Sequence, residues 1–211
     1  MQALSSTLTF SEAGDARSDA VAITDLSALS GFGCKGPRAE SALRSLGIPL
    51  PGDANSWMPF RSEGVVLRLG RSEFLFQDEP GANTTCELRD KIAGSAGVYP
   101  VLRHDLVLAL TGPRLSELFA RTCSFDFREF ERKPDLVVMT TMLGVSVTLI
   151  ACEFASRRGF RLWCDGTYGI YFLAQMLSIA EELGGGAADF CDLHTNARSP
   201  LTPSLHPQES T

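Results

Sequence analysis

The sequence predicts an α+β fold built from two related halves, each with the element order β-α-β-β-α. The first observation behind this prediction is a repeat. The segment 36–43, which begins Gly-Pro-Arg, returns about 76 residues later as the segment 112–118, and similar strand patterns follow each copy. Repetition indicates an internal duplication, and whatever both copies share is then scaffold. The second observation is that paired strands follow the first helix of each half, which favours antiparallel sheet with helices laid on it.

The first half is placed at residues 21–97. Proline opens its first helix because no N–H is needed in a first helical turn, and glycine ends it. Its two later strands flank a tight turn that contains glycine, which predicts a hairpin. The expected elements are a strand at Val21–Thr24, a helix opened by Pro37 and ended by Gly47, strands at Val65–Leu69 and Glu73–Phe76, and a helix at Thr85–Ala93.

The second half is placed at residues 98–184 and repeats this order. The expected elements are a strand at Leu106–Leu110, a helix opened by Pro113, strands at Val145–Ile150 and Phe160–Trp163, and a helix at Tyr168–Leu183. The last helix is expected to be largely buried, because its apolar residues recur at helical spacing. They are Ile170, Phe172, Leu173, Met176, Leu177 and Ala180.

The two ends of the chain have a different composition. Residues 1–20 are rich in Ser, Ala and Asp without a sustained period, and they are interpreted as an N-terminal arm. Residues 185–211 shift towards Ser, Thr and Pro, and they are interpreted as a tail that forms no core.

Charge and hydropathy exclude several classes of partner. The net charge of −6 and the pI near 5.1 argue against a grip on phosphate backbones, so no nucleic acid partner is expected. No leader pattern and no run of about 18 apolar residues is found, which predicts a cytoplasmic protein without a membrane segment. The six cysteines form no Cys-x-x-Cys pair, so reduced thiols are expected.

Three motifs are candidates for sites of chemistry. The glycines of 31–36 satisfy G-x-G-x-x-G, but Asp25–Ser30 separates them from the expected strand, so the dinucleotide signal is weak. Cys191 and His194 form the only close pair of zinc-type ligands, and they fall in the tail. His104 stands beside Asp105, yet neighbours in a strand point to opposite faces and form no relay. No catalytic, cofactor-binding or metal-binding residue is assigned.

Four residues are candidates for a subunit interface. Arg103 and Asp105 are two apart, so in a strand they would share one face, as an ion pair or directed together at a neighbouring subunit. Trp163 and Tyr168 are aromatic residues with one polar end, which suits either core or interface.

Six short segments, in the same order along residues 21–184, match a known family. They are Phe32–Gly36, Leu69–Leu75, Val98–Val101, Thr122–Asp126, Gly144–Val147 and Leu162–Asp165. In these segments the chain resembles the gamma subunit of heterotetrameric sarcosine oxidase. The resemblance implies the α+β fold of the N-terminal, folate-binding part of the glycine-cleavage aminomethyltransferase. It also implies a complex with alpha, beta and delta subunits that demethylates sarcosine oxidatively, with folate as one-carbon acceptor.

The resemblance places the cofactors of that complex on other subunits: FAD and the amine on beta, FMN between alpha and beta, NAD and tetrahydrofolate on alpha, and zinc on delta. The transferase has a catalytic aspartate, but no residue within Asp78–Asp90 can be aligned with it. The expectation is therefore a non-catalytic subunit that exposes an apolar patch when isolated. Two alternatives remain: the small subunit of a related enzyme such as N-methylglutamate dehydrogenase, and an independent folate-binding one-carbon transferase module.

Overall fold

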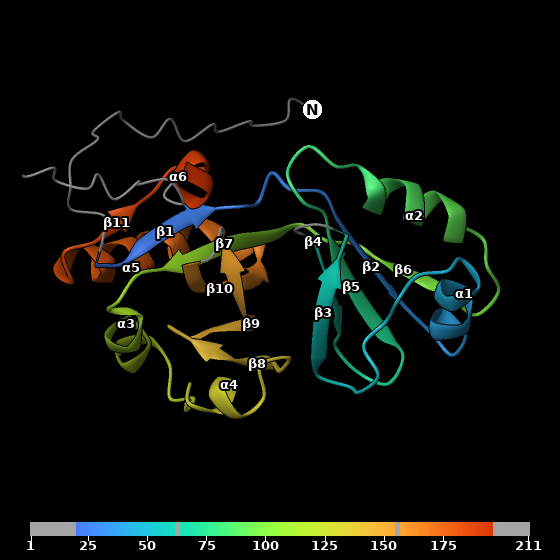
Figure 1. Cartoon of the computed structure of the whole chain (residues 1–211), viewed down its shortest axis with the longest axis horizontal. Coiled ribbons are helices and arrows are strands. Elements are labelled where there is room, and N and C mark those ends of the chain that lie inside the picture. The colour runs from blue at the N-terminus through green and yellow to red at the C-terminus, as the bar shows by residue number, and fades with distance from the viewer. Residues whose placement is uncertain (1–19, 62–63, 155–156, 196–211) are drawn as a thin grey trace, which may run out of the picture.

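The structure is a computed structural model that describes residues 20–61, 64–154 and 157–195. Two mainly antiparallel sheets pack against each other and helices cover the outer face of each, so the fold has four layers (Figure 1). This arrangement is the α+β class that the sequence predicts. Within the described ranges, no helix is long and apolar enough to cross a membrane.

Sheet A has six strands. In spatial order they are β11 (Gly186–Ala187), β1 (Ala22–Asp25), β7 (Asp105–Thr111), β10 (Arg157–Asp165), β9 (Val145–Phe154) and β8 (Val137–Met142). Neighbouring strands are antiparallel except β1 and β11, which are parallel. The helices on its outer face are α3 (Leu115–Thr122), α4 (Glu129–Arg132) and α5 (Gly169–Glu182).

Sheet B has five strands, all paired antiparallel. In spatial order they are β3 (Ser56–Phe60), β4 (Gly64–Arg68), β5 (Glu73–Gln77), β2 (Gly31–Lys35) and β6 (Tyr99–Val101). The helices on its outer face are α1 (Ala39–Ser45) and α2 (Thr84–Ile92). The hairpin of β4 and β5 and both helices lie where the sequence predicts them.

Strand β7 shows why its sequence is apolar without interruption. Successive side chains of a strand point to opposite faces. Leu106, Leu108 and Leu110 pack against the helices of sheet A, whereas Val107 and Ala109 face sheet B. The side chains between the sheets form the inner core, which consists of Leu26, Val65, Leu67, Leu75, Val107, Ala109, Val137, Ile150, Phe154, Trp163 and Leu193. Both faces of β7 are therefore buried, and polar residues are excluded from its centre.

The two sheets exchange their first strands. Strand β1 precedes β2 in the chain but pairs with β7 in sheet A, and β6 precedes β7 but pairs with β2 in sheet B. From β1 and β6 onwards the sheets have equivalent strand orders, β1-β7-β10-β9-β8 and β6-β2-β5-β4-β3. Each predicted half thus contributes one strand to the sheet of the other half. The origin of this arrangement by duplication remains a prediction.

The element order within each half differs from the predicted β-α-β-β-α, because each half has two additional strands, β2 and β3 in the first and β6 and β8 in the second. Strand β3 contains Pro59, which weakens a strand pattern, but β3 lies at a sheet edge where the missing N–H is tolerated. Strand β8, at the corresponding edge of sheet A, was likewise not predicted from the sequence. These two edges meet, since Trp57 N donates to Asp135 O at 2.8 Å and Val137 N donates to Asn55 O at 2.9 Å.

Two of the three glycines of the G-x-G-x-x-G pattern lie in a strand that the sequence analysis did not predict, and the third, Gly36, follows that strand. Gly31 and Gly33 are part of β2, which pairs antiparallel on both sides, whereas the glycines of a dinucleotide-binding loop follow the end of a parallel strand. Because glycine is depleted in strands, the composition of this segment did not indicate a strand. A Cβ at Gly33 would lie 3.0 Å from Cβ of Val101 and 3.1 Å from Nε of Arg103, so glycine lets these residues cross the strand closely.

The fold continues beyond Gly184, into the segment predicted to be a tail. Strand β11 pairs with β1, and the helix α6 (Phe190–Thr195) follows it. Leu193 is buried in the inner core and Phe190 packs against the same core. Residues 185–195 are therefore part of the fold. The predicted arm up to residue 19 and the rest of the tail, 196–211, lie outside the described residues.

Candidate functional site

The chain crosses from sheet B to sheet A between β6 and β7 (Figure 1). Arg103 lies in this crossover, and its Nη1 is 3.6 Å from Oδ2 of Asp105 at the start of β7. Its Nη2 is 3.7 Å from Oε1 of Glu73 at the start of β5. The ion pair that the sequence suggested is present, and through Glu73 it also links the two sheets.

The Asp105 carboxyl lies in a partly dry environment. Burial raises the pKa of Asp105 above its usual range, Arg103 opposes this rise, and the neighbouring Asp165 adds to it. The pKa of Asp165 is shifted in the opposite direction. Hydrogen bonds from the hydroxyl and the backbone N–H of Thr167 hold it below its usual range. His104 is exposed, and its carbonyl oxygen accepts a hydrogen bond from Gly166 N at 3.0 Å.

The other two interface candidates have different environments. Trp163 is only 3% exposed and belongs to the inner core, so it offers no surface to another subunit. Tyr168 is 54% exposed at the end of the 3-10 helix η1 (Gly166–Tyr168), directly before α5. The sequence could not separate these aromatics, because the composition of a core strand and of an interface is similar.

Several large apolar side chains around the crossover and the start of α5 are exposed. Leu102 is 81% exposed and Ile170 is 78% exposed, although Ile170 was expected in the buried stripe of α5. The buried face of α5 consists instead of Phe172, Leu173, Met176 and Ala180. We call Leu102, Tyr168, Ile170 and Tyr171 the crossover patch.

A buried carboxylate that the sequence analysis left without a role anchors α2. Asp78 follows β5 and is buried, and its Oδ2 accepts hydrogen bonds from Thr85 N at 2.9 Å and from Thr85 Oγ1 at 2.8 Å. Thr85 Oγ1 is also 2.7 Å from Ser30 Oγ, which is 3.3 Å from Cys86 Sγ. A carboxylate that accepts from the first turn of a helix stabilises its N-terminus. The chain of contacts therefore holds β5, α2 and the β1–β2 loop together.

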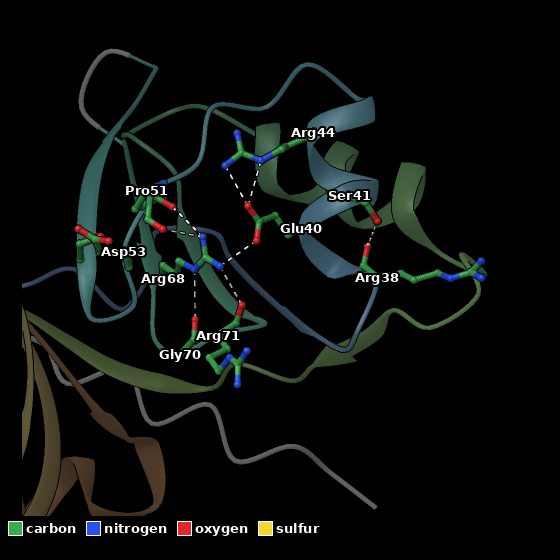
Figure 2. Close-up of polar contacts among 11 residues, drawn as sticks. Arg38, Glu40, Ser41, Arg44, Pro51, Asp53, Arg68, Gly70 and Arg71 are labelled. Atoms are coloured by element: carbon green, nitrogen blue, oxygen red, sulfur yellow. Dashed lines mark hydrogen bonds and ion pairs between the residues drawn. The ribbon is translucent and has the colours of Figure 1, made fainter.

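Arg68 is the most highly bonded charged residue of sheet B, as Figure 2 shows. It donates to Glu40 at 2.8 Å and to four backbone carbonyl oxygens, those of Pro51, Gly52, Gly70 and Arg71. A guanidinium has five N–H donors, and all five are used here. Arg68 is therefore saturated and is a structural residue, with no donor left for an anionic ligand.

The remaining candidates for chemistry are cysteines and metal ligands. Among the described residues, no group of three His, Cys, Asp or Glu could hold a metal ion. The six cysteines all lie within the described ranges and form no disulfide there. Burial raises the pKa of Cys34 to about 12 and those of Cys152 and Cys164 to about 11, so these thiols are poor nucleophiles.

No protein-family model and no curated protein matches the sequence. Solved structures match the fold. A chain of heterotetrameric sarcosine oxidase from Corynebacterium sp. U-96, in complex with pyrrole 2-carboxylate, aligns with a TM-score of 0.65 and 18% identity, covering 82% of this chain and 92% of that chain. Aminomethyltransferase T of the glycine cleavage system from Bartonella henselae aligns with a TM-score of 0.61 and 13% identity, covering 82% of this chain and 48% of that chain.

These alignments define the fold as one shared with an aminomethyltransferase. The alignment covers 92% of the sarcosine oxidase chain, so nearly the whole of that chain shares this fold. The transferase continues for about as much again beyond the shared fold, because less than half of it is covered.

Proposed function

We propose that this chain is the gamma-type, non-catalytic subunit of a heterotetrameric sarcosine oxidase, which oxidatively demethylates sarcosine to glycine with folate as one-carbon acceptor. The observation that carries the proposal is the 92% coverage of a chain from such a complex at similar chain length. The aminomethyltransferase alignment covers only 48% of that chain, so it supports the shared fold and not the activity of the whole transferase.

The polar groups of the described residues support a structural role. Asp78 caps α2, Arg68 is saturated by carbonyl oxygens and Glu40, and Asp105 is paired with Arg103. Each group is engaged in holding elements together, and none is presented with a free nucleophile or base. In the proposed complex, which we place in the cytoplasm, the alpha, beta and delta subunits hold FAD, FMN, NAD, tetrahydrofolate and zinc.

The transferase-like fold supports a second candidate, an independent folate-binding one-carbon module. It predicts that the isolated chain binds tetrahydrofolate. A calorimetric titration of the isolated chain, carried to millimolar tetrahydrofolate without heat of binding, would remove this candidate.

The main proposal is tested by co-expressing the chain with the products of its neighbouring genes, with and without an affinity tag on this chain. We expect a flavin-containing assembly of four different subunits that oxidises sarcosine. Assaying N-methylglutamate in parallel separates a sarcosine oxidase from the related dehydrogenase. Recovery of this chain alone, as a monomer without flavin, contradicts the proposal.

A further inference from the structure

The crossover patch is gathered by the tertiary structure from two distant parts of the chain. The hydrogen bond from Gly166 N to His104 O, 3.0 Å long, holds the crossover against η1. Leu102 and Tyr168 each lie two residues from one end of this bond. Tyr171, in the first turn of α5, lies beside the β8–β9 turn, where its hydroxyl donates to Leu143 O at 3.3 Å. The crossover and the start of α5 are therefore held close together, and each carries exposed apolar side chains.

Exposure of this kind requires an explanation. In the described chain, seven large hydrophobic side chains are exposed, and four of them lie in the crossover or in the segment 168–171. Leu102 and Ile170, at 81% and 78%, are the two most exposed of the seven. Large apolar side chains that are exposed close to one another on a folded protein indicate a site of interaction. Neither residue contributes to the buried clusters of the fold, so folding of this chain alone does not account for them.

A carboxylate beside the patch, that of Asp165, indicates which charge a partner surface would carry. Asp165 precedes η1, its carboxylate is exposed, and no cation of the described residues pairs with it. Oδ1 of Asp165 accepts from Thr167 N at 2.8 Å and from Thr167 Oγ1 at 2.7 Å, which fixes the carboxylate at the edge of the patch. A partner surface with Arg or Lys opposite this carboxylate would complement it.

The same carboxylate disfavours two other occupants. A second copy of this chain, docked by the same patch about a two-fold axis, would bring two Asp165 carboxylates towards each other, and like charges at an interface are unfavourable. An anionic membrane surface would repel the carboxylate and the net charge of −6. The favoured occupant is a different protein.

We propose that the crossover patch docks this chain onto another subunit of its complex, through a partner surface that carries apolar side chains and a cation opposite Asp165. This inference rests on the proposed function, and it assigns the surface by which the subunit is held. Ile170 and Leu102 are the apolar anchors, and Asp165 orients the contact.

The test compares single variants in the co-expressed complex, with a tag on this chain. Ile170→Asp and Leu102→Asp place a charge in the patch, and we expect each to weaken recovery of the other subunits about 30-fold or more, as for residues at the centre of an interface. Leu46→Asp and Met139→Asp are matched controls, because Leu46 and Met139 are exposed apolar residues outside the patch. Circular dichroism of each purified chain checks that it is folded.

A second variant tests the charge separately. Asp165→Asn keeps an oxygen that can accept from Thr167 and removes the charge, so assembly should weaken and depend less on salt concentration.

The outcomes separate the two proposals. If the wild-type chain assembles and the two patch variants assemble equally well, the patch inference is wrong and the proposed function stands. If the wild-type chain does not assemble at all, both fail. Patch-dependent dimerisation of the isolated chain in sedimentation, or binding to vesicles of phosphatidylglycerol and phosphatidylcholine, would also overturn the inference.

Discussion

Gly36 and Gly112 occupy equivalent positions in the two sheets and have nearly the same backbone conformation, with φ of 132° and 124°. Each begins a Gly-Pro-Arg turn that leads into a helix. A Cβ at Gly36 would meet the carbonyl oxygen of Gly97, directly ahead of β6, and a Cβ at Gly112 would meet that of Ala20, ahead of β1. The turn of each half is thus packed against the segment that delivers the exchanged strand.

These glycines should be irreplaceable by alanine. Gly36→Ala and Gly112→Ala force an L side chain into a left-handed conformation and against a backbone oxygen, so each should lower the free energy of unfolding by about 2 kcal/mol or more. Gly52→Ala is the control, because a Cβ at Gly52 meets nothing within 4 Å and its φ is not positive. Urea unfolding followed by tryptophan fluorescence measures all three. Equal stability of the variants and the control contradicts the packing described.

Arg68 should be a determinant of stability in sheet B. Arg68→Met removes all five hydrogen bonds of the guanidinium, and we expect a loss of about 2–4 kcal/mol in the free energy of unfolding. Arg44→Met is the control, since Arg44 pairs with the same Glu40 but is half-exposed, and such helix pairs contribute about 0.5 kcal/mol. Thermal unfolding should show the large difference between the two variants.

The thiols should react with a maleimide in an order set by burial. Cys191 is exposed and should react first, whereas Cys34, Cys152 and Cys164 have raised pKa values and should react only after unfolding. Mass spectrometry of peptides after timed labelling at pH 8 gives the order. Rapid modification of Cys34 in the folded protein would contradict its placement in the core of sheet B.

Asp105 and Asp165 should give opposite dependences of stability on pH. The pKa of Asp105 is raised by burial, so its ionised form opposes folding, and this penalty is relieved as pH falls through the raised value towards the unfolded one. The pKa of Asp165 is lowered by Thr167, so its contribution is present above the unfolded value and is lost as pH falls through the lowered value.

The comparison uses Asp105→Asn and Asp165→Asn in urea unfolding between pH 7 and pH 3. Relative to its Asn variant, the wild type should gain stability at Asp105 and lose it at Asp165 as the pH falls. The same sign of change at both positions would be inconsistent with these environments.

The strand exchange makes each half incomplete. A fragment of residues 1–97 lacks β7 and β11, which both pair with β1, and it lacks β6, which pairs with β2. We expect this fragment and its complement, residues 98–211, to be unfolded alone and to form the native structure when they are refolded together. Circular dichroism and size-exclusion chromatography follow the reaction, and cooperative unfolding of either fragment alone would contradict the exchange.

The sequence predicted the elements whose signals are local. Pro37 and Pro113 mark the two helices, and the hairpin of β4 and β5 follows from its turn. Strand β2 was missed because it contains glycine, and its Gly33 is needed for the close approach of Val101 and Arg103, a contact between segments almost 70 residues apart. The fold of residues 186–195 was missed because β11 is a strand only by pairing with β1.

The candidate site was predictable only in part, for a similar reason. The ion pair of Arg103 and Asp105 follows from residues two apart in the sequence. The burial of Trp163 and the exposure of Ile170 depend on which face of the strand or helix the rest of the fold covers. Periodicity identifies an apolar stripe, but it does not tell how much of the stripe the neighbouring elements reach.

The position of β1 between β7 and β11 has a consequence for synthesis on the ribosome. When β1 is made, both of its neighbours in sheet A are still to come, and the later of them, at Gly186–Ala187, is translated more than 160 residues after Ala22. At about 5–20 residues per second, the nascent strand waits roughly 10–30 s for its second neighbour. Sheet A is therefore completed only after Ala187 has been made, and throughout that interval the apolar side chains of Val21 and Ile23 are a natural target for chaperones.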